Sequence, residues 1–183
     1  MDSTEKAKVT YEISQIDELV GKAQVLVSLC ESKEPDFIEI TAVGGVLHSF
    51  YNGLENIFVL FGKSLGFDFD ASPRWHRNLI DFMFARFDFL PSDLRARLTE
   101  HMGFRHFFRH SYGYTIKWEK CSYLFMGMTG FWQTMRREII RMCDSSKRAR
   151  ASAIFYGASP PSVVCVPRIS RVRSTHKPCA FRA

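Results

Sequence analysis

The stretch from Asp36 to Gly66 reads DFIEITAVGGVLHSFYNGLENIFVLFGKSLG. Its apolar side chains recur every three or four residues, which is the spacing of one face of an α-helix. The residues on this face are Phe37, Ile40, Val43, Leu47, Phe50, Leu54, Ile57, Phe58 and Phe61. The pattern predicts a long helix from Asp36 to about Leu65, with Gly66 as its C-terminal stop. Polar residues inside it, such as His48 and Glu55, exclude a membrane span.

The same periodicity predicts four further helices. They run from Ser3 to about Leu29, from Asp70–Pro73 to Phe87, from Leu90–Asp93 to about Gly113, and from Trp118 to Met142. Five helices with short connections indicate an all-α fold, an antiparallel bundle of about five helices.

Local signals add detail to these helices. Ser3 or Thr4 is expected to cap the first helix. Pro73 suits the first turn of the third helix, and Gly113 suits the end of the fourth. The pair Gly44-Gly45 lies inside the second helix, where glycine is unfavourable. We therefore expect a neighbouring helix to pack closely against this pair.

The charge is distributed unevenly along the chain. The formal net charge is +6, but all 19 acidic residues lie between Asp2 and Asp144. Eight of the 25 Lys and Arg residues follow Ser146, so residues 1–144 carry 17 basic against 19 acidic residues, a net charge of −2. The basic character therefore belongs to the tail and does not argue for RNA binding by the helical domain.

The composition changes after Asp144. Residues 145–183 hold no acidic residue, four of the seven prolines and no helical periodicity. We therefore divide the chain into a helical domain, residues 1–144, and a basic tail, residues 145–183, that is disordered or foreign to the domain. The five cysteines are scattered without a CxxC pair, which argues against a disulfide framework and a structural zinc site. The polar N-terminus lacks a signal-peptide profile, so a cytoplasmic protein is expected.

Chemistry-bearing residues gather in one stretch, RHFFRHSYGY, from Arg105 to Tyr114. Arginine pairs with phosphate oxygens in a two-pronged geometry, and histidine exchanges protons near neutral pH. On a regular helix Arg105 and His110 are separated by ~140° of rotation and ~7.5 Å of rise, so they do not share a face. They meet only if the helix opens near Gly113, or if a second copy supplies one of them across a two-fold axis.

Other interpretations of this stretch remain open. Arg105 alone is also compatible with a solvated surface arginine. His106 and His110 have the spacing of two zinc ligands, but no glutamate follows His106 and no third ligand is evident. A structural role is equally compatible with His106. We expect Phe107 and Phe108 to belong to the core.

The stretch resembles the signature of HepT-like toxins in the HEPN superfamily of small helical ribonucleases. Arg105, a polar His106, His110 and Tyr112 fit its pattern of Arg, polar residue, His, one residue and Tyr. Residues 47–58, 75–80 and 114–118 also resemble family segments. The resemblance covers roughly Glu5 to Cys143.

The resemblance implies a metal-independent endoribonuclease without a cofactor, the toxin of a type VII-like toxin–antitoxin pair. Arg105 and His110 would be catalytic, in a composite site of a homodimer, and the 2′-hydroxyl of RNA would attack the adjacent phosphate. His106, Arg109 and Glu55 would orient residues or bind substrate, with Glu55 either paired to Arg105 or in solvent. Transfer RNA is a plausible substrate class. The partner would be an MNT-type nucleotidyltransferase antitoxin that adds AMP to Tyr112.

Two other functions are compatible with the sequence. The first is a non-catalytic HEPN module that binds nucleotides or a nucleotidyltransferase through the same groove. The second is a plain helical oligomer whose polar stretch, from Arg105 to Tyr114, is a solvated edge.

Overall fold

The computed structural model describes residues 1–69, 74–110 and 115–155, with side chains described as far as Ser145. The described residues form six helices and no strand. These are α1 (Ser3–Ser32), α2 (Phe37–Leu65), α3 (Trp75–Arg86), α4 (Ser92–His110), α5 (Trp118–Met126) and α6 (Met128–Phe155). The predicted all-α antiparallel bundle is therefore confirmed.

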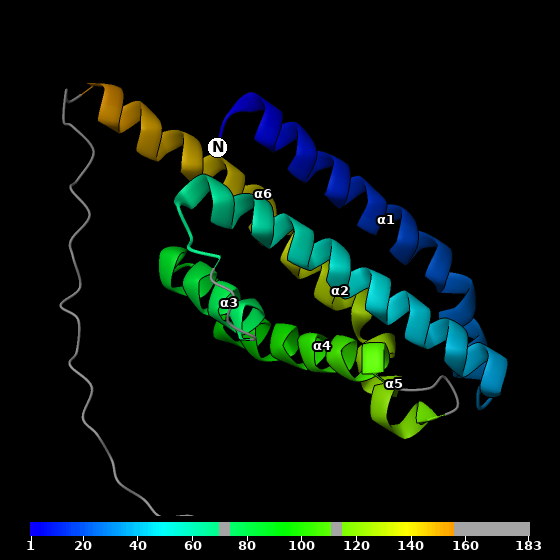
Figure 1. Ribbon diagram of the computed structural model, residues 1–183. Helices are drawn as coiled ribbons and strands as arrows, with labels where there is room; N and C mark the ends of the chain where they lie inside the picture. Colours follow the sequence, from blue (N-terminus) through cyan, green and yellow to red (C-terminus); the bar gives the residue numbers. More distant parts are fainter. Residues whose placement is uncertain (70–73, 111–114, 156–183) are drawn as a thin grey trace, which may run out of the picture.

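Helix α2 is the centre of the bundle. It packs against α1 on one side and against α3, α4 and α5 on the other, and α6 lies against α1 and α5 (Figure 1). Its inward residues Leu47, Phe50, Leu54, Ile57 and Phe61 are fully buried. Burying such side chains contributes about 1.5–3 kcal/mol each, so the apolar face read from the sequence organises the fold.

The ends of the first two helices follow capping rules. The Asp36 carboxylate accepts a hydrogen bond from the Glu39 amide, and the Glu39 carboxylate accepts one from the Asp36 amide. Gly66 ends α2 in the left-handed region with φ 77°, as predicted. The expected cap of α1 was wrong: Asp2 caps it in a capping box with Glu5, and Ser3 is the first helical residue.

Gly44 lies where α2 approaches α4. A Cβ there would come within 2.7 Å of the Phe108 ring and 2.9 Å of Ile116. The predicted close approach is thus confirmed for Gly44. It is wrong for Gly45, where an added Cβ would meet nothing within 4 Å.

The single helix expected from Trp118 to Met142 is in fact two helices that meet at Gly127. The guanidinium of Arg97 on α4 donates to the Gly127 carbonyl at 3.0 Å. A Cβ at Gly127 would lie 2.5 Å from Nη2 of the same arginine. The break therefore coincides with a contact from another helix, which periodicity within residues 118–142 cannot reveal.

The C-terminal part of the chain starts as helix. Helix α6 continues to Phe155, so the boundary that we placed at Asp144 does not coincide with a helix end. The division into two parts stays a prediction. The expected start of the third helix at Asp70–Pro73 and the role of Gly113 lie outside the described residues. Within the described residues, none of the helices is both long and apolar enough to cross a membrane.

Candidate functional site

Arg105 lies on the face of α4 that packs against α2. Its Nε donates to Oδ1 of Asn52 at 2.7 Å, and its Nη2 lies 3.1 Å from Oε2 of Glu55. The side chains of Arg105 and Glu55 are 15% and 9% exposed. The interpretation of Arg105 as a solvated surface arginine is therefore wrong. For Glu55, the salt bridge with Arg105 is observed rather than a position in solvent.

Glu55 is also bound by two further groups. Its Oε1 lies 2.5 Å from Nδ1 of His76 on α3. Tyr51, one turn earlier on α2, forms a side-chain hydrogen bond with the same carboxylate. Burial and the negative charge of Glu55 raise the pKa of Tyr51, so its hydroxyl stays protonated and donates. A buried carboxylate is costly unless it is paired and hydrogen-bonded, and these partners satisfy it.

A polar stripe on α2 supports this pair. His48 lies one turn before Asn52, and its Nδ1 is 3.3 Å from Nδ2 of Asn52. Partial burial and the positive charges of Arg105 and Arg109 lower the pKa of His48. His48, Asn52 and Glu55 share one helical face through steps of four and three residues. The described network therefore runs from His48 through Asn52, Arg105 and Glu55 to His76.

Asn52 and His76 were not predicted as site residues. A signal for Asn52 was present, because polar residues at helical spacing interrupt the apolar second helix at His48, Asn52 and Glu55. His76 carried no such pattern, since it contacts Glu55 from another helix.

A basic cavity of about 360 Å³ opens beside Arg105, between α3 and α4. Four arginines and two histidines line it, together with Met102 and Gly103: Arg74, Arg77, Arg105, Arg109, His76 and His106. None of these eight residues is acidic, so the cavity has the charge to bind an anion such as phosphate. The structure thus brings Arg105, His106 and Arg109 together around one cavity.

His110 is not among the residues that line this cavity, and it is exposed. Its ring centroid is 4.7 Å from that of His106, one turn earlier on α4. Because α4 remains helical through His110, the helix does not open between Arg105 and His110. The alternative of an opening near Gly113 lies outside the described residues, and a second copy as the source of one of the two residues stays a prediction. Tyr112 lies outside the described residues.

The neighbouring predictions have mixed outcomes. Phe108 packs against the core, but Phe107 is 40% exposed, so its assignment to the core was wrong. Neighbouring His106 is likewise exposed. No group of three or more His, Cys, Asp or Glu side chains gathers anywhere in residues 1–69, 74–110 and 115–145, so the pair His106 and His110 has no third ligand there.

The fold and the site together describe a small helical protein with a buried Arg–Glu pair beside a basic cavity. A family model described as HepT-like protein matches residues 42–146, more than half of the chain. The chain therefore belongs to the HepT-like proteins of the HEPN superfamily. The match spans the polar face of α2 and both Arg105 and His110. No curated protein and no solved structure matches the chain.

Proposed function

We propose that this protein is a metal-independent endoribonuclease, the toxin of a type VII-like toxin–antitoxin pair. The observation that carries the proposal is the position of Arg105, held by Asn52 and Glu55 at the wall of a cavity rich in arginine. These contacts engage only part of the guanidinium N–H groups, so others remain for a phosphate. A charged group positioned in advance costs no reorganisation when negative charge develops in the transition state.

In the proposed reaction the 2′-hydroxyl of RNA attacks the adjacent phosphorus. The bond to the 5′ oxygen breaks, leaving a 2′,3′-cyclic phosphate and a 5′-hydroxyl end. His110 acts as general base for the 2′-hydroxyl or as general acid for the leaving oxygen. Arg105 stabilises the phosphate charge, while His106 and Arg109 bind the flanking strand.

The proposed site is composite. Arg105 and His110 point in different directions from one regular helix, so a second copy related by a two-fold axis supplies the His110 that faces a given Arg105. The exposure of both His106 and His110 fits this arrangement, because a partner can reach them.

Regulation in this proposal acts at Tyr112, two residues after the end of α4. A nucleotidyltransferase partner would transfer AMP from ATP to the tyrosine oxygen and release pyrophosphate. The added phosphate would be attracted to the neighbouring arginines and would compete with substrate for them.

The test is cleavage of total transfer RNA by the full chain in excess EDTA. Arg105→Ala and His110→Ala should each abolish cleavage, and mixing the two variants should restore part of it if the site is composite. Arg95→Ala is the matched control, because Arg95 is an exposed arginine on the same helix, paired with Asp81. Cleavage that persists in either catalytic variant would refute these roles.

The alternative function is a non-catalytic module that binds nucleotides or a nucleotidyltransferase. The buried pairing of Arg105 with Glu55 favours it in one respect, since the carboxylate offsets the charge of the arginine. A folded dimer that binds RNA or AMP without cleaving RNA would establish this alternative.

A further inference from the structure

A second cavity lies between α4 and α5. It measures about 240 Å³. Its inner wall is apolar and buried, formed by residues such as Phe104, Ile116 and Leu124. Two aromatic side chains at its rim are uncovered: Phe107 is 40% exposed and Tyr123 is 54% exposed. Large exposed aromatics around an apolar hollow are the arrangement on which planar ligands stack.

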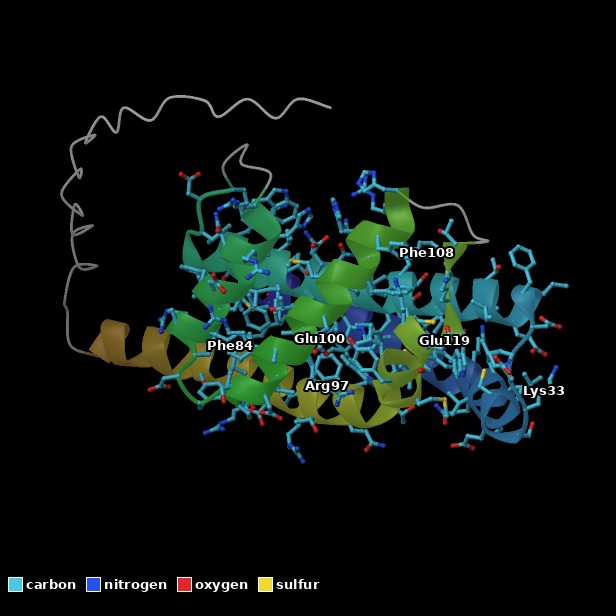
Figure 2. The ribbon with its side chains drawn as sticks, turned by 90° about the horizontal axis from the view of Figure 1, so that it is seen from below. Lys33, Phe84, Arg97, Glu100, Phe108 and Glu119 are labelled. Atoms are coloured by element: carbon cyan, nitrogen blue, oxygen red, sulfur yellow. The ribbon has the colours of Figure 1, made fainter. Side chains whose placement is uncertain are left out.

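Charged groups surround the same cavity. Lys117 and Lys120 line it from the start of α5, and both are exposed. Glu100 lines it from α4. Partial burial, together with the negative charge of Glu100, raises the pKa of Tyr123. Figure 2 shows Glu100 on α4, with α5 beside that helix. The cavity therefore combines stacking surfaces, two cations and one hydrogen-bond acceptor.

Gly103 connects this cavity to the basic one, because it lines both. The two cavities use adjacent faces of α4: Glu100, Phe104 and Phe107 on one, Arg105 and its neighbours on the other. A Cβ at Gly103 would meet nothing within 4 Å, so packing does not demand glycine there. Glycine is unfavourable in a helix interior. At position 103 it leaves the surface between the two cavities without a side chain.

We propose that the α4–α5 cavity is a nucleobase subsite, and that a single RNA strand crosses α4 over Gly103 with a phosphate in the basic cavity. The inference rests on the proposed function, since it adds a base-binding element to the same RNA site. The base stacks on Phe107 and Tyr123, and the lysines bind its flanking phosphates. Stacking of a base on protein aromatic side chains requires an unpaired base, so the strand in this proposal is single.

The carboxylate of Glu100 gives this subsite a preference among bases. A carboxylate only accepts hydrogen bonds, so it binds a base that presents an amino group. Cytosine offers its N4 amino group to a glutamate, whereas uracil has a carbonyl oxygen at the same position. The subsite therefore favours cytosine over uracil, which has nearly the same size.

The test measures binding rather than cleavage. Fluorescently labelled oligocytidylate and oligouridylate of equal length are titrated with the full chain in EDTA at one fixed salt concentration, on a His110→Ala background that prevents cleavage. Tyr123→Leu and Phe107→Leu should each weaken binding about tenfold. Glu100→Gln should remove the preference for oligocytidylate. Tyr11→Leu, at a 61% exposed tyrosine on α1, is the matched control and should leave binding unchanged.

A larger side chain at position 103 tests whether the RNA strand crosses α4 there. Gly103→Gln should weaken oligonucleotide binding about tenfold. Gly130→Gln in α6 is its control, because an added Cβ there also meets nothing within 4 Å. Equal effects of the two substitutions would overturn the role assigned to Gly103.

The outcomes separate this inference from the proposed function. Unchanged binding in both aromatic variants overturns the subsite, even if transfer RNA is cleaved. Loss of binding in these variants supports it, even if no RNA is cleaved. If Tyr123→Leu instead dissociates a dimer and does not alter oligonucleotide binding by the dissociated chain, the cavity belongs to a second copy and the subsite is refuted.

Discussion

His101 provides a test of the core that does not depend on any activity. It lies on α4 with 1% of its surface exposed, and its ring stacks on Phe131 at 5.1 Å and approaches Phe50 at 5.3 Å. Among the described residues neither ring nitrogen has a hydrogen-bond partner. Burial, with a smaller contribution from Arg97, lowers the pKa of His101 from 6.5 to about 4.

This shift determines the direction of a pH effect. In the unfolded chain His101 takes up a proton near its ordinary pKa of 6.5, whereas in the folded chain it does so only near pH 4. The unfolded state therefore binds more protons between these values, and stability falls as the pH falls. The stability that depends on a neutral His101 is fully present above pH 6.5 and is lost below pH 4. This part of the free energy of unfolding amounts to about 3 kcal/mol.

The perturbation is His101→Phe, which keeps an aromatic ring between Phe50 and Phe131. His101→Leu serves if the larger ring does not fit. Urea denaturation followed by tryptophan fluorescence at several pH values, at one protein concentration, gives the free energy of unfolding. The wild type should lose about 3 kcal/mol more than the variant between pH 7 and pH 4.

An exposed histidine provides the control for this experiment. His110→Gln also removes one imidazole, but from the surface, and should follow the pH dependence of the wild type. If His101→Phe and His101→Leu lose as much stability as the wild type between pH 7 and pH 4, the assignment of a neutral buried His101 is refuted.

Three further predictions concern packing and the site. Gly44→Ala should lower the free energy of unfolding by about 1–3 kcal/mol, because the added Cβ meets Phe108 and Ile116. Gly45→Ala should raise it by up to about 1 kcal/mol, because the added Cβ meets nothing within 4 Å. Changes of the same sign in urea denaturation would contradict this. Glu55→Ala should lower the free energy of unfolding by about 3–5 kcal/mol, because it leaves Arg105 buried without its carboxylate partner. Asp81→Ala, which removes an exposed ion pair, should lower it by less than about 1 kcal/mol. Similar losses in the two variants would contradict the buried pairing. Arg105→Lys should lower transfer RNA cleavage at least about tenfold, because lysine cannot reproduce the two-pronged contact; an unchanged rate would refute the geometry.

The fold was predictable where the structure depends on local sequence. The apolar face of α2, its start at Asp36 and its end at Gly66 all follow from spacing and capping within one segment. The break at Gly127 was not predicted from periodicity, and the hydrogen bond observed there comes from Arg97, which lies 30 residues away. The cap of α1 was misplaced by one or two residues, since several polar residues near Ser3 fit a capping role.

The candidate site was predictable only in part for the same reason. Its central arginine was found from the motif of α4, and Glu55 from the resemblance of α2. The partners Asn52 and His76 became evident only when α2, α3 and α4 were brought together. Arg105 and Asn52 are 53 residues apart in the sequence, and His76 and Glu55 are 21 residues apart. No local sequence pattern therefore connects the members of either pair.

The carboxylate of Glu55 couples the stability of the helical bundle to the conformation of the candidate site. One oxygen contacts α3 through His76, and the other contacts α4 through Arg105. Any event that pulls α3 away from α2 removes the contact of His76 with that carboxylate, and the carboxylate then interacts more strongly with Arg105. A phosphate that draws Arg105 toward the cavity in turn leaves more of the carboxylate to His76. The docking of a twelve-residue helix and the availability of the arginine are thus thermodynamically linked, and each must respond to the other.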